Sequence, residues 1–332
     1  MGRVKVGISL ALVATAMAAT TSACGPSASG AAPAPSTATK GAAAADPAKS
    51  ATASPTPSKP SGPPLLLNTI TPANGSTVGV VMPVSVVFTK PVAISGRATV
   101  EKHLKITTSV PTVGAWHWFS STRVDFRPQQ YWKPGTKVSI DAALTGVTDG
   151  NGRYGTHDYH HAFTIGDDNE TKVSVTHHTM QVWHNGTVVK NFPIDAGSPD
   201  FPSWDGTMAV IDKEPKVRMR SCSVHITCDK KNPNFYDLTL PWDVHLTNSG
   251  TYIHYSDGDP YPGHSYGSHG CVHLSLADSK WYYAFVKQGD PVTITGSPRG
   301  KADGDNGYAA YNLSWSQWLQ NSGAGQFNTT VA

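Results

Sequence analysis

The sequence predicts a mainly β protein, in which a β-sandwich domain is followed by a second β-rich domain with one notable helix. The 332 residues include 31 Gly and 25 Pro, which favour many turns and loops. Short strand-like runs recur at spacings of about 8–12 residues between turn signals, a pattern typical of β-sandwiches. In the second half of the chain, only Ser275–Lys287 has a convincing helical pattern of apolar residues.

Charge and cysteine content narrow the class of protein further. Lys and Arg number 26 against 23 Asp and Glu, a net charge of +3, and only 15% of the residues are charged. This near-balance argues against a nucleic-acid binder that relies on a dense basic patch. Four cysteines are too few to build a disulfide-based fold. At about 100–200 residues per domain, the length allows two or three domains.

The N-terminus has the order of a secretory signal peptide. Arg3 and Lys5 precede an apolar run from Val6 to about Ala19, and small residues follow before Cys24. The run is shorter than the roughly 20 residues of a membrane-spanning helix, and no later segment reaches that length. We therefore expect a signal peptide over 1–23 and an exported, extracytoplasmic protein.

Cys24 resembles the acylated cysteine of bacterial lipoproteins. Thr-Ser-Ala-Cys is similar to their lipobox, although Thr21 stands where an aliphatic residue is usual. The alternative is ordinary cleavage at an Ala-x-Ala-like site, which would leave Cys24 as an incidental residue. Of residues 25–64, 36 of 40 are Ala, Gly, Pro, Ser or Thr, a composition that cannot form a core. We expect 24–64 to be a spacer, with lipid on Cys24 as the only membrane contact, at the outer face of the cell membrane.

The first folded domain is expected over 65–167. Its aromatic residues Trp116, Trp118, Phe126 and Trp132 are more simply explained as core than as a ligand platform. No nucleophile or metal spacing stands out, so we expect a spacer or docking module. The expected strands are Val78–Thr89, Ala98–Val100, Lys105–Ser109, Ala115–Phe119, Thr122–Phe126, Lys137–Ala142 and Ala162–Ile165.

The second domain is expected over 168–297, after a polar break at 166–170. Asn185-Gly186 between two alternating runs is a strong hairpin signal. The tail 298–332 contains Trp315 and Trp318, which favour a strap packed back on a domain over an exposed aromatic patch. The expected strands are Lys172–Val175, Met180–His184, Val188–Ile194, Gly206–Asp212, Val244–Thr247, Tyr252–His254 and Pro291–Thr295.

The residue types of a thiol acyltransferase gather between 252 and 273. Cys271 lies in a Gly-rich turn shortly before the predicted helix, whose N-terminus would lower the thiol pKa. The backbone N–H groups of His269, Gly270 and Cys271 could hold an oxyanion. His254, His269 and His273 are all candidates for the imidazole that a thiol nucleophile needs.

Three alternatives compete with a catalytic Cys271. A disulfide is one, but Cys222 and Cys228 are near each other and form the natural pair, which leaves Cys271 unpaired. A structural, buried cysteine is the second. A zinc site is the third, although no established zinc spacing is present among its plausible ligands, His254, His264, His269, Cys271 and His273.

His254, followed after a Gly-rich loop by Ser268-His269-Gly270-Cys271, resembles the active-site motif of bacterial L,D-transpeptidases of the YkuD type. The resemblance covers about Thr171–Gly296. The wider layout of anchor, spacer, Ig-like domain, catalytic domain and Trp-containing tail is similar to actinobacterial members. The resemblance thus implies an Ig-like β-sandwich followed by a YkuD-type β-rich catalytic domain.

Carried over to this chain, the resemblance implies that Cys271 is the nucleophile and His254 its general base. His269 and Gly270 would supply backbone donors to the oxyanion together with Cys271. Ser268 would line the acyl pocket, and Tyr255 or Ser256 would lie beside the base.

The resemblance also concerns residues outside the Ser268–Cys271 motif. The segment Lys213–Thr239 corresponds to a lid, which a Cys222–Cys228 disulfide would stiffen and from which Tyr236 would contact substrate. Family members usually carry Asn where this chain has His273, and an imidazole there can titrate near neutrality. The substitution therefore bears on the pH optimum.

The resemblance also implies the reaction. The Cys271 thiolate would attack the third residue of a peptidoglycan tetrapeptide stem, release D-Ala and pass the acyl group to an amine of a second stem, forming a 3→3 cross-link. Water as acceptor would make an L,D-carboxypeptidase. No metal or organic cofactor is needed, no nucleic-acid partner is expected, and carbapenems would acylate the cysteine.

Two other functions are alternatives to that of a transpeptidase. A papain-like peptidase places its Cys before its His, the reverse of the order here. A catalytically idle wall-binding lipoprotein would scaffold other enzymes, and a raised thiol pKa would favour it. We expect a monomer, because no interface feature stands out.

Overall fold

The computed structural model describes residues 61–332. The predicted signal peptide, Cys24 and most of the 24–64 spacer lie outside the described residues. The described residues belong to one compact unit. None of their helices is both long and apolar enough to cross a membrane.

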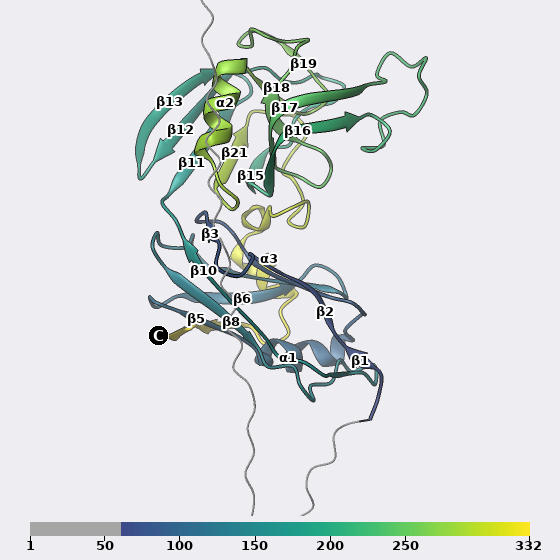
Figure 1. The fold of residues 1–332 in the computed structure, drawn as a ribbon, viewed down its shortest axis with the longest axis vertical. Coiled ribbons are helices and arrows are strands. Elements are labelled where there is room, and N and C mark those ends of the chain that lie inside the picture. Colours follow the sequence, from purple (N-terminus) through teal and green to yellow (C-terminus); the bar gives the residue numbers. More distant parts are fainter. Residues whose placement is uncertain (1–60) are drawn as a thin grey trace, which may run out of the picture. The chain divides into compact units, whose positions relative to one another are not determined.

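The first β-rich part consists of two five-stranded sheets (Figure 1). One sheet has the order β2 (Leu67–Thr71), β4 (Val84–Phe88), β7 (Arg123–Pro128), β6 (Val113–Trp118) and β22 (Gln326–Asn328). The other has the order β23 (Thr330–Val331), β5 (Leu104–Thr108), β8 (Lys137–Ala142), β10 (Tyr159–Ile165) and β3 (Thr77–Val78). Two short strands, β1 (Pro64–Leu65) and β9 (Tyr154–Gly155), pair beside them.

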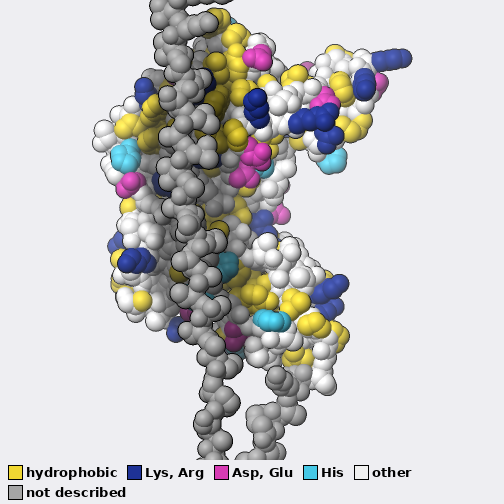
Figure 2. All heavy atoms as spheres, in the orientation of Figure 1, with side chains coloured by type: hydrophobic (Ala, Val, Ile, Leu, Met, Phe, Trp, Pro, Cys, Tyr) yellow, Lys and Arg dark blue, Asp and Glu magenta, His cyan; other side chains and the backbone are white. Residues whose placement is uncertain are grey.

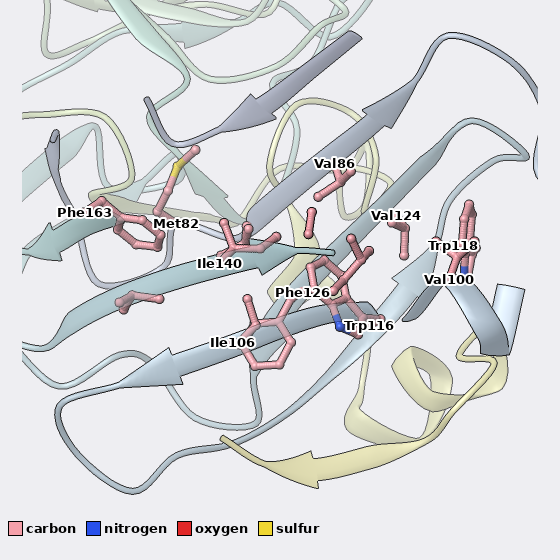
Figure 3. Packing of buried hydrophobic residues seen from close by; sticks show 14 of the residues in the cluster. Met82, Val86, Val100, Ile106, Trp116, Trp118, Val124, Phe126, Ile140 and Phe163 are labelled. Atoms are coloured by element: carbon pink, nitrogen blue, oxygen red, sulfur yellow. The ribbon is translucent and has the colours of Figure 1, made fainter. Parts of the chain in front are cut away.

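A single apolar core lies between these sheets. Figure 3 shows Trp116 and Phe126 of one sheet together with Ile106 and Ile140 of the other, all fully buried. Trp118 and Trp132 are buried as well, and the Trp132 indole N–H donates to the Met82 carbonyl at 2.8 Å. The prediction that the aromatic cluster is core is confirmed.

One expected strand of this part is wrong. Residues 98–100 lie in helix α1 (Ile94–His103), not in a strand. A run of three residues is too short to reveal its period, and tertiary contacts decide the conformation here. The buried Glu101 carboxylate accepts hydrogen bonds from the Trp118 indole and from the backbone N–H groups of Gly323 and Ala324, which fixes the helix in place.

The second part also has two main sheets. The five-stranded sheet has the order β13 (Thr187–Pro193), β12 (Thr179–His184), β11 (Asn169–Ser174), β21 (Pro291–Thr295) and β15 (Gly206–Ala209). The four-stranded sheet has the order β16 (Asp212–Arg220), β17 (Asp237–His245), β18 (Tyr252–Tyr255) and β20 (Val272–Leu274). The short strands β14 (Ala196–Gly197) and β19 (Tyr266–Ser268) pair with each other.

The predicted helix is present as α2 (Leu276–Phe285). The Ser275 hydroxyl accepts a hydrogen bond from the Asp278 backbone and so caps its N-terminus. The buried Tyr282 packs into the second core, where its hydroxyl is 3.0 Å from that of Thr171. Strand β20 separates Cys271 from this helix, so the expectation that Cys271 lies at the helix N-terminus is wrong.

The polar segment expected as a lid is a long hairpin formed by β16 and β17 (Figure 1). Most of its side chains are at least partly exposed. The sequence therefore lacks the alternation of apolar and polar residues that would predict these strands. Figure 2 shows several Lys and Arg side chains on this projecting hairpin.

The C-terminal tail returns to the first domain, as predicted for a strap. It contains a short 3₁₀ helix (Ala310–Asn312) and α3 (Trp315–Gln320), and then supplies β22 and β23 as edge strands. Trp318 is fully buried, and its indole N–H donates to the Ala115 carbonyl at 3.0 Å. The mainly β, two-domain fold class is therefore confirmed.

Candidate active site

The parallel pairing of β18 with β20 brings the sequence-predicted nucleophile and base together. His254 lies opposite His273 in the register of these strands. Cys271 precedes His273 by two residues, so both side chains face the same side of the sheet. All three line one pocket of about 720 Å³. The motif alone does not predict this parallel pairing, because 16 residues, including the short strand β19, lie between β18 and β20.

Cys271 carries a free thiol in a partly enclosed position. Its Sγ donates to the Gly250 carbonyl at 3.6 Å. Burial raises the thiol pKa to about 12, and the negative charge of Asp243 adds to the effect. The expected lowering of this pKa is wrong, because the sulfur is buried and no helix N-terminus lies at it.

His254 is a neutral imidazole with one nitrogen available. Its Nδ1 is 2.8 Å from the Tyr255 carbonyl, which can only accept, so Nδ1 carries the proton and Nε2 the lone pair. Among the described residues, no hydrogen-bond partner is found for Nε2. Burial, with a smaller contribution from the nearby His273, lowers the pKa of His254 to about 3. The side chain is therefore in the form that accepts a proton.

Hydrogen bonds within the Ser268–Cys271 turn hold its shape. The Ser268 hydroxyl donates to the Cys271 carbonyl at 2.6 Å and accepts from the Gly270 N–H at 3.1 Å. Gly270 has a φ of 114°, which favours glycine. Since Ser268 already engages the Gly270 N–H, the N–H groups of His269 and Cys271 are the turn's free donors within residues 61–332.

The two residues expected beside the base differ in their role. Ser256 lines the pocket, whereas the Tyr255 side chain does not. Tyr255 follows His254 directly in the strand and points to the opposite face. It contributes its carbonyl oxygen, which orients the imidazole.

The hairpin β16–β17 approaches the motif through aromatic contacts. The His269 ring lies between Tyr236 of the hairpin and Phe201, at centroid distances of 4.9 and 4.8 Å. Tyr236 lines the pocket. Cys222 and Cys228 form a disulfide near the tip, with their Cα atoms 4.5 Å apart. The hairpin thus covers one side of the pocket.

Three acidic residues near the site were missed by the sequence reasoning. Asp195 accepts hydrogen bonds from three backbone N–H groups of the 263–265 loop. Asp259 binds Nδ1 of His273 at 2.9 Å. Asp243 is fully buried without a hydrogen-bond partner in the described residues, and burial raises its pKa to about 7. Asp243 lies within β17, Asp195 just after β13 and Asp259 in the turn after β18. The pairing of these strands is set by distant residues, so no local pattern marks the three carboxylates.

The histidines and cysteine of the motif do not form a metal site. Among residues 61–332, no group of three or more His, Cys, Asp or Glu side chains is arranged to hold a metal ion. The geometry instead presents a thiol and a neutral imidazole at one end of a pocket.

Two family models match the chain. A bacterial Ig domain matches residues 35–148, and an L,D-transpeptidase catalytic domain of the YkuD family matches residues 168–294. The second match contains both His254 and Cys271.

Curated relatives are found in Mycobacterium tuberculosis. L,D-transpeptidase 2 of strain CDC 1551 is 33% identical over 258 residues, which cover 75% of this chain and 60% of the relative. L,D-transpeptidase 1 of strain H37Rv is 34% identical over 231 residues, 68% of this chain and 84% of the relative. The chain thus spans 60% of the length of the first relative and 84% of the second.

Solved structures agree with this assignment. The LdtMt1 structure in complex with imipenem has a TM-score of 0.59 and 32% identity, and covers 71% of this chain and 100% of that chain. The structure of L,D-transpeptidase 3 from M. tuberculosis with a faropenem-derived adduct has a TM-score of 0.57 and 27% identity, with 69% and 98% coverage. The paired strands, the enclosed thiol and these matches agree, and the chain belongs to the L,D-transpeptidase family.

Proposed function

We propose that this protein is a peptidoglycan L,D-transpeptidase with Cys271 as nucleophile and His254 as general base. The observation that carries the proposal is the free thiol in one pocket with a neutral imidazole whose Nε2 has no partner among the described residues. A thiol and an imidazole so placed can exchange a proton during acyl transfer. Family membership supports the same reaction class.

In the proposed reaction, a donor tetrapeptide stem enters the pocket. The Cys271 sulfur bonds to the carbonyl carbon of the third residue as the thiol proton passes to Nε2 of His254. The backbone N–H groups of His269 and Cys271 stabilise the oxyanion. The bond to the terminal D-Ala then breaks, and its amine leaves with the proton from His254.

The thioester is resolved by a second substrate. An acceptor amine of another stem attacks the thioester carbon, gives its proton to His254 and releases the Cys271 thiol, which leaves a 3→3 cross-link. Water in place of the amine gives the L,D-carboxypeptidase reaction. No step requires a metal or organic cofactor.

One observation favours the second candidate, a catalytically idle wall-binding lipoprotein. The thiol pKa of about 12 means that the resting protein holds Cys271 as a neutral thiol. A resting thiolate is not required, however, when an adjacent base removes the proton as the sulfur–carbon bond forms. The neutral, buried His254 supplies that base, so the transpeptidase reading is the better supported of the two.

Carbapenem acylation is the direct test. We expect imipenem to add once to the purified chain by intact mass, and we expect Cys271→Ala to abolish the adduct. His254→Gln should keep the thiol and slow acylation by about 10²–10⁴-fold, the usual contribution of a general base. If a folded, reduced protein forms no adduct, the catalytically idle lipoprotein becomes the better supported function.

The acceptor is identified by product analysis. Incubation with a tetrapeptide stem should give a cross-linked dimer and free D-Ala, with both lost in Cys271→Ala. Release of D-Ala with tripeptide alone would identify a carboxypeptidase.

The proposed location is the cell envelope, with the catalytic domain joined by the 24–64 spacer to lipid on Cys24. The signal-like N-terminus and the cysteine after small residues support it. Membrane fractionation of wild type and Cys24→Ala tests the anchor: the variant should leave the membrane fraction, and equal retention of both would contradict lipidation.

A further inference from the structure

The outer part of the β16–β17 hairpin, residues 215–241, carries an excess of positive charge. It contains five Lys and Arg against two Asp and no Glu. The net charge of the whole chain is +3, so the other residues balance to zero. Figure 2 shows several of the basic side chains on this projecting hairpin. The positive surplus of the chain is therefore concentrated on the segment that covers one side of the pocket.

The basic residues of β16 share one face of the hairpin. Residues 216–220 pair in regular register with residues 237–241, so successive side chains alternate between the two faces. Lys216, Arg218 and Arg220 lie on the same face, and all three are exposed. We call this surface the basic face. At about 3.4 Å per residue, its charges recur roughly every 7 Å along the strand.

The opposite face of the same strands is apolar. Four of its residues line the pocket, namely Val217, Met219, Leu238 and Leu240. Arg218 and Arg220 line the pocket as well, so the basic face borders its rim. The hairpin thus presents an apolar wall to the pocket and a row of cations beside it.

Positive charge on the basic face is only partly neutralised. Its acidic residue, Asp237, accepts two hydrogen bonds from Arg218, from Nε to Oδ1 at 2.7 Å and from Nη2 to Oδ2 at 2.8 Å. These bonds lower the pKa of Asp237, and the charges of Arg220 and Lys230 add to the effect. Among the described residues, Lys216 and Arg220 form no ion pair. Two cations of the basic face are therefore free to bind an anion.

The other carboxylates of the hairpin lie at its two ends. Asp229 belongs to the segment between the strands and is followed in the chain by Lys230 and Lys231. Glu214 pairs with Asp243 at the root, on the other side of the interruption in the ladder. The basic face between these ends keeps its positive charge.

A polymer with repeated carboxylates is complementary to this surface. A row of cations attracts a row of anionic groups, and attraction between exposed charges weakens as salt is added. Each stem of the proposed substrate ends in D-Ala with a free carboxylate, and peptidoglycan carries many such stems. The stem that reacts enters the pocket next to the basic face, so its neighbours lie within reach of the cations.

We propose that the basic face binds carboxylates of the peptidoglycan polymer beside the pocket and so retains the polymer while one of its stems reacts. This inference rests on the proposed function for the identity of the polymer. The binding is electrostatic, and no covalent bond forms or breaks. Lys216 and Arg220 supply the free charges, whereas Asp237 holds Arg218 in place.

Co-sedimentation with purified insoluble peptidoglycan tests the basic face. The full chain carries Cys271→Ala, which prevents turnover, and the bound fraction is measured as salt is added. At low salt, we expect Lys216→Gln/Arg220→Gln to weaken binding about three- to tenfold, the effect of losing two exposed ion pairs. The difference should vanish near 1 M salt, where the Debye length is only about 3 Å.

Lys190→Gln/Lys301→Gln is the matched control. It removes the same charge from exposed positions outside the hairpin and should bind like the parent protein. Equal losses in the two variants overturn the inference, because net charge alone would then explain the binding. Unchanged binding in Lys216→Gln/Arg220→Gln overturns it as well. If that variant does not fold, Lys216→Gln is compared with Lys190→Gln and the same criteria decide.

The chemistry of the anion is tested with altered polymer. Conversion of the peptidoglycan carboxylates to amides should weaken binding of the parent protein to the level of Lys216→Gln/Arg220→Gln. Removal of any attached phosphodiester polymer should leave binding unchanged. Binding that survives amidation, or that disappears with the phosphodiester polymer, overturns the assignment to carboxylates.

This experiment is independent of the test of the proposed function. Absence of an imipenem adduct on the wild type overturns the transpeptidase proposal, while sedimentation still decides whether the basic face binds carboxylates. An adduct on the wild type together with equal sedimentation of all variants overturns the inference alone.

Discussion

Asp195 shows how a single buried side chain organises the loop above the site. Its carboxylate is fully buried and accepts hydrogen bonds from the backbone of Gly263, His264 and Ser265 and from the Ser265 hydroxyl. Burial alone would raise its pKa, but these donors outweigh burial and lower the pKa to about 2. The loop between the proposed base and nucleophile is therefore tied to the end of β13.

The lowered pKa of Asp195 predicts how the stability of the folded protein changes with pH. The folded-state pKa lies below the ordinary value of 3.8, so the contribution of Asp195 is complete above about pH 4 and is lost as the pH falls towards about 2. The shift corresponds to about 2 kcal/mol. Urea unfolding of wild type and Asp195→Asn should differ by about this amount at pH 6 and converge at pH 2. A difference that does not shrink in acid would contradict the assignment, and Asp141→Asn, at an exposed pair, is the control.

At the scale of elements, the β16–β17 hairpin is irregular where it joins the sheet. Glu214 pairs with Asp243 and Lys216 with Pro241, so Pro215 and Trp242 have no ladder partner. Trp242 has a φ of 61°, in the region that favours glycine. The ladder is therefore interrupted between the sheet and the outer part of the hairpin, where Tyr236 contacts His269.

The disulfide near the tip of the hairpin should stabilise that region alone. Closing a loop of this size contributes about 2 kcal/mol by chain entropy. In a Cys222→Ser/Cys228→Ser variant, we expect faster hydrogen exchange over residues 221–236 and unchanged exchange in β11 and β21. Faster exchange in those strands as well would mean that the disulfide supports the whole fold.

The same region offers a test of the aromatic contact. Tyr236→Ala removes a ring pair of about 1 kcal/mol, whereas Tyr236→Phe keeps the ring. We expect acylation by imipenem to slow several-fold in the alanine variant and to stay near wild type in the phenylalanine variant. Equal rates in all three proteins would exclude a role for the contact in holding the hairpin over the pocket.

At the scale of the molecule, the C-terminal tail joins the two β-rich parts. It leaves the second part after β21 and adds an edge strand to each sheet of the first. The tail also packs against Arg127 of β7. The buried guanidinium lies 4.8 Å from the centroid of the Trp318 ring and donates to the Leu313 carbonyl at 3.0 Å. Backbone bonds from Gly79 to Gln288 and from Val81 to Gly289 join the parts a second time.

Trp318 should therefore be the residue of the tail on which stability depends most. Truncation of a fully buried Trp to Ala costs about 3–5 kcal/mol. We expect Trp318→Ala to lower the midpoint temperature of the first unfolding transition, measured by calorimetry. Trp315→Ala, at a partly exposed position of the same helix, should lower it by less than half as much. Equal effects would contradict a specific packing role for Trp318.

The sequence by itself determined the features that depend on local chemistry. Alternation of apolar residues gave most strands, such as Lys137–Ala142 and Pro291–Thr295, and the helix after the motif. Composition predicts the spacer, and residue types at a characteristic spacing predict His254 as base and Cys271 as nucleophile; these stay predictions. Each of these signals is carried by residues close together in the chain.

Only the tertiary structure decided the features that depend on burial and on distant partners. Residues 98–100 form a helix because Glu101 binds the tail some 220 residues away. The thiol pKa is raised because the sulfur is buried. Strand β20, not a helix N-terminus, follows the cysteine, so the lowering that the sequence predicts is absent. Asp195, Asp243 and Asp259 reach the site through sheet pairing. Protonation energies depend on the solvent and charges around a group, and these are set by the fold rather than by sequence neighbours.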